Sequence, residues 1–238
     1  MTKHFANPAP PCPAIEVRFA DRPCMLDPSG ALWLSDEKLL VVADLHLEKG
    51  TAWAGRGVFL PPYDSRMTLG LLRAVIDTYA PEGLVFLGDS FHDCKGPDRL
   101  QGADRELLAN LTMRQNTWWI TGNHDPELAE GLSGISCDEL CIDAVRLCHI
   151  PEPLNAGAFQ ISGHLHPVAT VSGRGRTLRR RCFAADANRL ILPAFGAYTG
   201  GLNIRDKAFK GLFDPKSFAA HVIGDRQIYP FPGIPFAR

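Results

Sequence analysis

The 238-residue chain has no apolar run long enough to span a membrane, and its N-terminal stretch "MTKHFANPAPPCP" lacks the apolar core of a signal peptide. We therefore expect a cytoplasmic protein with no membrane partner. The chain also lacks an excess of charge of either sign, since its formal net charge is −1. Composition alone therefore predicts neither a nucleic-acid nor a membrane surface.

Paired cysteine motifs are missing as well. The seven cysteines are odd in number, form no CxxC pair, and include several in apolar stretches such as "VRLCHI". This usage favours buried free thiols over a disulfide framework. Cys148, which adjoins a candidate ligand, is interpreted as a strand-packing residue.

Turn-forming residues are abundant, with 22 glycines and 19 prolines. This abundance indicates a loop-rich and strand-rich fold. Residues 1–13 are expected to form a flexible lead-in. No internal repeat or low-complexity block marks a boundary beyond them, so residues 14–238 are expected to form a single domain.

The first half of the chain alternates strand and helix patterns. Apolar runs and turn residues predict a hairpin at 31–44, helices at 64–80 and 104–114, and buried strands at 83–89 and 117–123. Asp64 or Ser65 is the expected N-cap of the first helix, and Pro81 lies just beyond its end. Strands alternating with helices predict parallel strands joined by right-handed crossovers. Trp118 and Trp119, inside the last of these strands, are expected in the core rather than as base-stacking platforms.

After about residue 136 the pattern changes to short strands separated by turns, which predicts an antiparallel sheet or hairpins. We therefore infer two facing sheets with helices outside them. The stretch "ISGHLHPV" raises the question of why two histidines bracket Leu165. In a strand, His164 and His166 would share one face with bases about 6.6 Å apart. That spacing suits one metal ion or a close pair of ions, although a solvated hairpin end fits this fragment equally well.

Metal-competent side chains follow each expected strand in turn. The series is Asp44-x-His46, Gly-Asp89, Gly-Asn123-His124-Asp125, His149 and Gly-His164-x-His166. Open α/β sheets bind ligands at the carboxyl ends of their strands. Most of the eight histidines fall in this series, so scattered surface histidine explains it poorly.

This ordered series resembles the motifs of the calcineurin-like binuclear metallophosphoesterases, and all five motifs are present across residues 38–167. The resemblance implies an α/β fold, a four-layer α/β/β/α sandwich in which two facing mixed sheets are flanked by helices. It also implies two divalent metal ions between the sheets. By this resemblance Asp44, His46 and His166 bind the first ion, Asn123, His149 and His164 bind the second, and Asp89 bridges the two.

The resemblance also implies a catalytic role for residues that are not ligands. Two ions about 3.5–4 Å apart share a hydroxide that attacks phosphorus. His124 matches the histidine that neutralises the phosphate or protonates the leaving oxygen, and Asp125 is expected to orient its ring. Oxygen and nitrogen ligands without thiolate suit Mn²⁺, and Fe or Zn²⁺ is compatible.

The residues around these motifs indicate which subfamily the chain resembles. No Asp-Arg-Gly follows Asp89, unlike in Ser/Thr protein phosphatases of this group, and His124 is intact, unlike in UDP-diacylglucosamine pyrophosphatases. "ADLHLEKG", "GDSFHD", "GNHDPE", "GHLHP" and "RCFAADANRLILPAFGAYTGGLN" are similar to the SbcD-related group, and within it to the ligase-associated DNA damage response endonucleases. Ile150 departs from these relatives, which often carry Gly there.

This closer resemblance implies Mn²⁺-dependent cleavage of phosphodiester bonds, with single-stranded DNA as substrate, in a DNA repair system. A DNA ligase, a helicase and an exonuclease are the expected partners. Arginines cluster after the last motif, and Arg174, Arg176 and Arg179 are the candidate contacts to the strand's phosphates. A solvated hairpin explains this cluster equally well, and strand alternation separates Arg180 from part of it. Two alternative functions stay open: a phosphatase or pyrophosphatase for a small or lipid-linked phosphate ester, and a metal-stabilised scaffold with little turnover.

Overall fold

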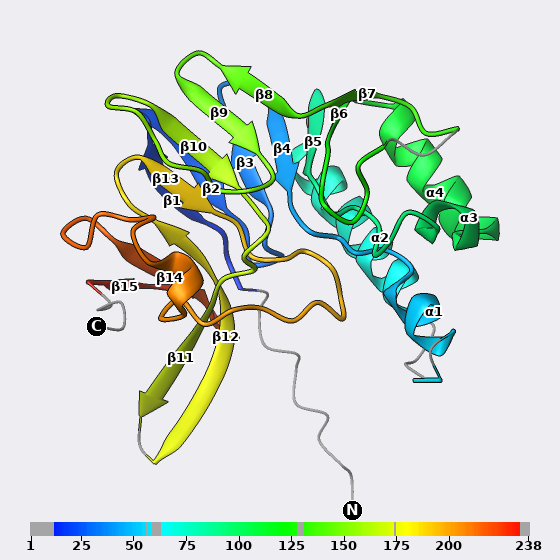
Figure 1. Ribbon diagram of the computed structural model, residues 1–238. Helices are drawn as coiled ribbons and strands as arrows, with labels where there is room; N and C mark the ends of the chain where they lie inside the picture. Colours follow the sequence, from blue (N-terminus) through cyan, green and yellow to red (C-terminus); the bar gives the residue numbers. More distant parts are fainter. Residues whose placement is uncertain (1–11, 56, 59–62, 128–130, 174, 234–238) are drawn as a thin grey trace, which may run out of the picture.

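Two β-sheets face each other in the computed structural model, which describes residues 12–55, 57–58, 63–127, 131–173 and 175–233 (Figure 1). The first sheet follows chain order: β1 (Ile15–Phe19), β2 (Arg22–Leu26), β3 (Leu32–Leu34), β4 (Leu39–Val42), β5 (Gly83–Leu87), β6 (Asn116–Ile120) and β7 (Ile135–Cys137). The second has the order β15 (Ile228–Pro232), β14 (Ala219–Ile223), β12 (Arg176–Ala185), β13 (Arg189–Ile191), β10 (Phe159–Ser162), β9 (Val145–Cys148) and β8 (Glu139–Ile142), and β11 (Val168–Gly173) pairs with β12.

The first sheet agrees with the sequence prediction. β3 and β4 form the expected hairpin, and β4, β5 and β6 are parallel neighbours. Helices α2 (Asp64–Tyr79) and α4 (Gly102–Met113) provide the crossovers and bury their apolar stripes against one face of the sheet. Trp119 lies in this layer and stacks on Phe86 with ring centroids 4.1 Å apart. The two tryptophans of β6 are therefore packing residues, since Trp118 packs against the cluster on the other face.

The start of α2 differs from the prediction. Its N-cap is Tyr63, which makes no side-chain capping bond. Asp64 instead accepts a hydrogen bond from the backbone N–H of Gly50, and Ser65 donates to Glu48. Both side chains tie α2 to the short helix α1 (Lys49–Ala54), so a tertiary contact replaces local capping.

The second sheet is mixed, not purely antiparallel. β10 pairs in parallel with both β9 and β13, whereas β8–β9, β12–β13, β12–β14 and β14–β15 are antiparallel. Turn residues predict that strands reverse, but they do not reveal which returning strands become neighbours. Both sheets are mixed and the fold class is α/β, as expected.

The outer layer of the second sheet contains little regular helix. An irregular segment with the single 3₁₀ turn η1 (Lys207–Phe209) covers this sheet through Phe209, Phe213 and Phe218. The regular helices in the described ranges, including the short α3 (Gly96–Arg99), all lie on the side of the first sheet (Figure 1). Apolar spacing cannot predict this covering, because aromatic residues in loops have no periodicity.

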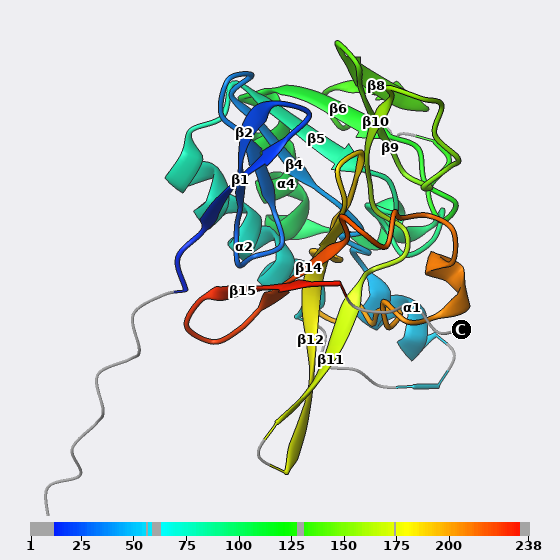
Figure 2. The ribbon, with the colours of Figure 1, turned by 90° about the vertical axis from the view of Figure 1, so that its left-hand side faces the viewer.

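β11 and β12 extend beyond the two sheets as a two-stranded arm (Figure 2). No helix in the described ranges is both long and apolar enough to cross a bilayer. All seven cysteines are free, and Cys148 is buried in β9, but Cys94 and Cys141 are exposed, in contrast to the expected burial.

Candidate metal centre

The predicted ligand residues meet where strands of both sheets end. Asp44, Asp89 and Asn123 follow the parallel strands β4, β5 and β6 of the first sheet. His149 follows β9, and the segment with His164 and His166 follows β10 of the second sheet. Each sheet therefore supplies part of one cluster, with the carboxyl ends of the strands on the same side.

His164 and His166 do not lie in a strand, in contrast to the expectation. β10 ends at Ser162, and the two histidines have φ angles of 67° and 44°. The turn is tight, since the N–H of Leu165 donates to the carbonyl of Gly163 at 2.8 Å. A left-handed turn, and not strand alternation, therefore brings the two rings together while Leu165 is buried.

Most residues of the cluster have a left-handed backbone conformation. The residues with positive φ include Asp44, His46, Asp89, His164 and His166, with values from 44° to 67°. This region is unfavourable for residues with a Cβ atom and is populated chiefly where the surroundings enforce it. The fold therefore holds five of the seven predicted ligands in a strained conformation.

The glycines that precede the ligands leave room for them. A Cβ atom on Gly88 would lie 2.5 Å from the ring of His149, and one on Gly163 would lie 2.6 Å from a carboxylate oxygen of Asp44. In both cases the sheet that carries the glycine receives a ligand from the other sheet. The Gly-Asp and Gly-His pairs of the sequence thus have a steric reason.

The first group of converging atoms comprises Asp44, His46 and His166. Nε2 of His166 lies 3.2 Å from Oδ1 of Asp44 and 3.4 Å from Nε2 of His46. Nδ1 of His166 lies 3.1 Å from the carbonyl oxygen of Gly200. A carbonyl only accepts, so the ring hydrogen belongs on Nδ1 and Nε2 presents a lone pair to the group.

The second group comprises Asp89, His149 and His164, with Asn123 beside them. Nδ1 of His149 donates to the carbonyl of Leu87 at 2.8 Å, so Nε2 again presents a lone pair. That Nε2 lies 3.0 Å from Oδ1 of Asn123, 3.1 Å from Nδ1 of His164 and 3.4 Å from Oδ1 of Asp89.

Both groups fit divalent cations. Oxygen and nitrogen lone pairs face one another at these short distances, which is unfavourable unless a cation lies between them. Burial lowers the pKa of His46 to about 3, which keeps this ring in the neutral form that metals bind. Burial acts against the charged form of His149 too, but its contact with the Asp89 carboxylate and the charge of Asp44 raise its pKa. The cluster thus favours positive charge at the second group.

Asp89 lies between the two groups. One carboxylate oxygen is 3.4 Å from His149 and the other is 3.8 Å from His46. Burial alone would raise the pKa of Asp89, but its contact with His149 lowers the pKa to about 2. The carboxylate is therefore ionised and placed to face both groups, which is the arrangement expected of a bridge.

His124 lies at the rim of the cluster. Its side chain is 38% exposed, and its Nε2 lies 3.9 Å from Oδ2 of Asp89. The ring is oriented by the backbone carbonyl of His92, which lies 2.6 Å from Nδ1. A ring with its hydrogen on Nδ1 presents Nε2 to the side of the cluster that solvent reaches.

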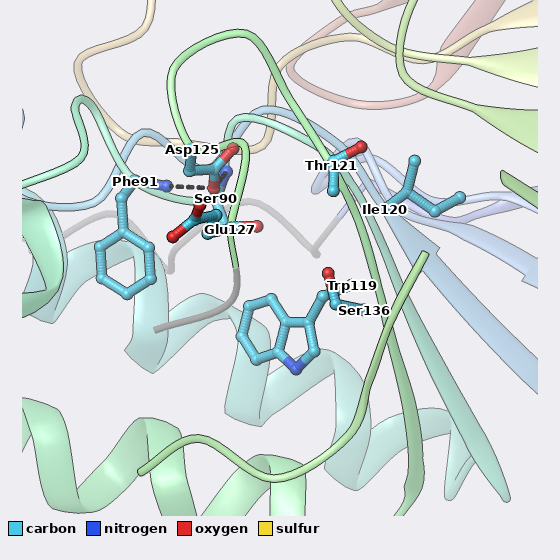
Figure 3. A pocket seen from close by; sticks show the side chains of 8 residues that line it. All are labelled: Ser90, Phe91, Trp119, Ile120, Thr121, Asp125, Glu127 and Ser136. Atoms are coloured by element: carbon cyan, nitrogen blue, oxygen red, sulfur yellow. Dashed lines mark hydrogen bonds between the residues drawn. The ribbon is translucent and has the colours of Figure 1, made fainter. Parts of the chain in front are cut away.

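Asp125 does not orient His124, contrary to expectation. Its carboxylate points away and accepts hydrogen bonds from the backbone N–H groups of Ser90 at 2.6 Å and Phe91 at 3.0 Å. Figure 3 shows it among the residues that line a small cavity of about 10 Å³ with Trp119. Burial raises the pKa of Asp125 to about 7. Its role in this arrangement is to fix the loop that carries Asp89.

His92 was not assigned a role from the sequence. Its ring joins His46 and His124 in a third group of converging nitrogen atoms, and it stacks on His124 with centroids 5.5 Å apart. Nε1 of Trp53 donates to Nε2 of His92 at 3.3 Å. The signal that could have identified it is its place in "GDSFHD", three residues after Asp89.

The two candidate arginines that the structure describes do not share a face. Arg174 lies outside the described residues. In the β11–β12 arm, Arg179 pairs with Thr170 and Arg176 pairs with Gly173, and strand alternation places them on opposite faces. Arg179 donates to the carbonyl of Gly201, next to the residue that contacts His166. Among the described candidates, Arg179 alone therefore lies toward the cluster.

No protein-family model matches the chain, and no curated protein matches it. Among solved structures, the nuclease MPE of Pseudomonas putida superposes with a TM-score of 0.73, over 92% of this chain and 100% of its own, at 26% sequence identity. This structural likeness agrees with the resemblance that the five sequence motifs indicate. The chain has the fold and the motifs of a calcineurin-like metallophosphoesterase. The phosphoesterase Yfce of E. coli also matches, over 82% of this chain and 99% of its own, but at 14% identity and a TM-score of 0.40, which is too low to carry weight.

Ile150, the departure from related sequences, does not disturb the cluster of this metallophosphoesterase. Its side chain is 46% exposed, whereas the adjacent His149 is buried and bonded to Leu87. The fold and the grouped histidines and aspartates are those of a metal-dependent phosphoester hydrolase.

Proposed function

We propose that this metallophosphoesterase is a binuclear, Mn²⁺-dependent phosphodiesterase that cleaves single-stranded DNA during repair. The main support is the full-length likeness to a nuclease, in a chain whose seven predicted ligands all converge. Two ions bound there would supply an activated water and neutralise charge on the phosphate. The proposed ligands are Asp44, His46, Asp89, Asn123, His149, His164 and His166.

The residues of the chain have separate tasks in this proposal. Asp89 holds the two sites at a fixed separation through its two oxygens. His124, with its ring turned by the His92 carbonyl, places Nε2 beside the bound phosphodiester and carries the proton for the leaving oxygen. Asp125 acts indirectly, because it holds the loop of Ser90 and Phe91.

Incubation of chelator-treated protein with Mn²⁺ and four substrates tests the proposal. The substrates are circular single-stranded DNA, duplex DNA, bis-p-nitrophenyl phosphate and p-nitrophenyl phosphate. We expect cleavage of the circle and of the diester, and little reaction with the monoester. Turnover of the monoester alone would favour the phosphatase alternative, and no turnover with two metals bound would favour the scaffold.

A further inference from the structure

Arg181 of β12 is a partly buried cation with no carboxylate partner among the described residues. Its Nη1 donates to the backbone carbonyls of Ser29 at 3.1 Å and Ala194 at 2.9 Å. These carbonyl contacts satisfy Nη1 but do not compensate the charge, and burial lowers the pKa of this guanidinium. A charge in such surroundings is unfavourable until an anion approaches it.

A groove of about 560 Å³ lies beside this arginine, and we call it the α2 groove. One wall is the outer face of α2, where Met67 is 57% and Leu71 38% exposed. Arg181, Phe195 and Thr199 line the rest. The groove therefore combines exposed apolar side chains with one uncompensated positive charge. Its volume falls in the range of roughly 300–1,000 Å³ that small-molecule ligands occupy.

The segment that lines the groove beside α2 also contacts the candidate metal centre. The N–H of Gly196 donates to the carbonyl of Asp44 at 3.2 Å, and the carbonyl of Gly200 lies 3.1 Å from Nδ1 of His166. Thr68 of α2 fixes the same segment by accepting from the N–H of Ala197 at 3.0 Å. The segment 196–200 thus contacts two proposed ligands and also borders the groove.

We propose that the α2 groove binds one unpaired nucleotide of the substrate strand, next to the phosphodiester at the metal centre, with a phosphate at Arg181 and the base against Met67 and Leu71. The inference rests on the proposed function. A nucleotide is the unit of the strand that offers both an anion and a flat apolar face, which matches the two halves of the groove. In a duplex the base faces are stacked, so only an unpaired nucleotide can use the apolar wall. The groove would therefore make the enzyme prefer single strands.

Variants of the groove test this with a labelled oligothymidylate as probe. Arg181→Met removes the charge, and Met67→Asp places a carboxylate on the exposed wall. Met113→Asp is the matched control, because Met113 is 69% exposed on α4 and does not line the groove. Binding is measured by fluorescence anisotropy on chelator-treated protein, and KM is measured with Mn²⁺ for the oligonucleotide and for bis-p-nitrophenyl phosphate.

We expect Arg181→Met to weaken oligonucleotide binding about tenfold or more, since a hydrogen bond to a charged group is worth about that factor. The log–log salt slope should flatten by about 0.7 for the lost phosphate contact. Met67→Asp should weaken binding in the same direction, Met113→Asp should not, and the loss on the oligonucleotide should exceed any loss on the small diester at least fivefold.

Unchanged affinity in both groove variants, or equal losses on both substrates, would overturn the inference. If Arg181→Met fails to fold, the exposed Met67→Asp decides alone. Dissociation of an oligomer by Met67→Asp with unaltered DNA binding would make the groove a contact between copies and would also overturn the inference. The proposed function fails separately if the wild-type enzyme cleaves no DNA, and anisotropy still reports on the groove in that case.

Discussion

Backbone carbonyls set the direction of the imidazole rings at the metal centre. Leu87 orients His149, Gly200 orients His166, and His92 orients His124. Rings fixed by backbone need no rearrangement when a ligand arrives, so the cluster is preorganised.

Asp89→Ala should abolish hydrolysis and lower metal content at both sites, because one carboxylate faces both groups of ligands. Metal per chain is measured by mass spectrometry after dialysis against Mn²⁺, beside turnover of bis-p-nitrophenyl phosphate. Asp98→Ala, at an exposed position in α3, is the control and should keep two ions. Two ions per chain in Asp89→Ala would disprove the bridging role.

His124→Ala should keep both metals and lose about 10²–10⁴-fold in turnover, the usual contribution of a positioned acid. The expected retention of metal follows from its place at the rim, 38% exposed and 3.9 Å from Asp89. The same two measurements apply. Loss of an ion in this variant would show instead that His124 is a ligand.

At the scale of elements, the β11–β12 arm places Arg176 and Arg179 on opposite faces. Arg179→Ala should weaken binding to single-stranded DNA and flatten the log–log salt slope by about 0.7, the value for one phosphate contact. Arg176→Ala is the control from the same strand and should leave the slope unchanged. Equal slopes in both variants and in the wild type would show that the arm does not bind the strand.

β14 carries a partly buried histidine, His221, whose Nδ1 has no hydrogen-bond partner among the described residues. Burial lowers its folded-state pKa below the usual 6.5. Above pH 6.5 neither state binds a proton there, and on acidification the unfolded state is protonated first. The stability that this neutral ring provides is therefore complete above pH 6.5 and is lost as the pH falls toward the folded-state pKa.

His221→Gln should remove this part of the acid sensitivity. The free energy of unfolding in urea is compared at pH 7.5 and 5.5, and the wild type should lose more than the variant, by at most about 1.4 kcal/mol per pH unit. The ligand histidines are the same in both proteins, so their contributions to the pH dependence of the free energy of unfolding cancel in the comparison. Identical losses would show that His221 is not protonated differently in the two states.

Periodicity predicted the elements whose packing is regular. The stripe of α2 and the apolar runs of β4, β5 and β6 were found because burial repeats every 3.6 residues or runs unbroken. The ligands were found because sequence motifs preserve their order. The turn at His164 was not predicted, because a left-handed conformation leaves no apolar period in the sequence. The parallel pairing of β10 has no local signal either, whereas His92 could have been found from its place in the motif that contains Asp89.

At the scale of the whole molecule, the metal centre joins the two sheets. Asp44, Asp89 and Asn123 come from one sheet and His149, His164 and His166 from the other. Ions bound between them would stabilise the native state only, by RT ln(1 + [L]/Kd). At a free Mn²⁺ concentration of 100 Kd the gain is about 2.7 kcal/mol.

Chelation should therefore lower the thermal unfolding midpoint, and Mn²⁺ should restore it in a concentration-dependent manner. Differential scanning calorimetry measures both, with Asp89→Ala as the variant expected to respond weakly. A midpoint independent of Mn²⁺ in the wild type would show that the ions do not hold the sheets together.

Five proposed ligands have a left-handed backbone, a conformation that glycine adopts without penalty. Folding stability alone would therefore favour glycine at the same positions where the proposed metal ions require aspartate or histidine. Natural proteins commonly hold such a compromise at their active sites. In a lineage released from selection for hydrolysis, these positions should be substituted first. The free energy of unfolding should then increase while hydrolytic activity is lost.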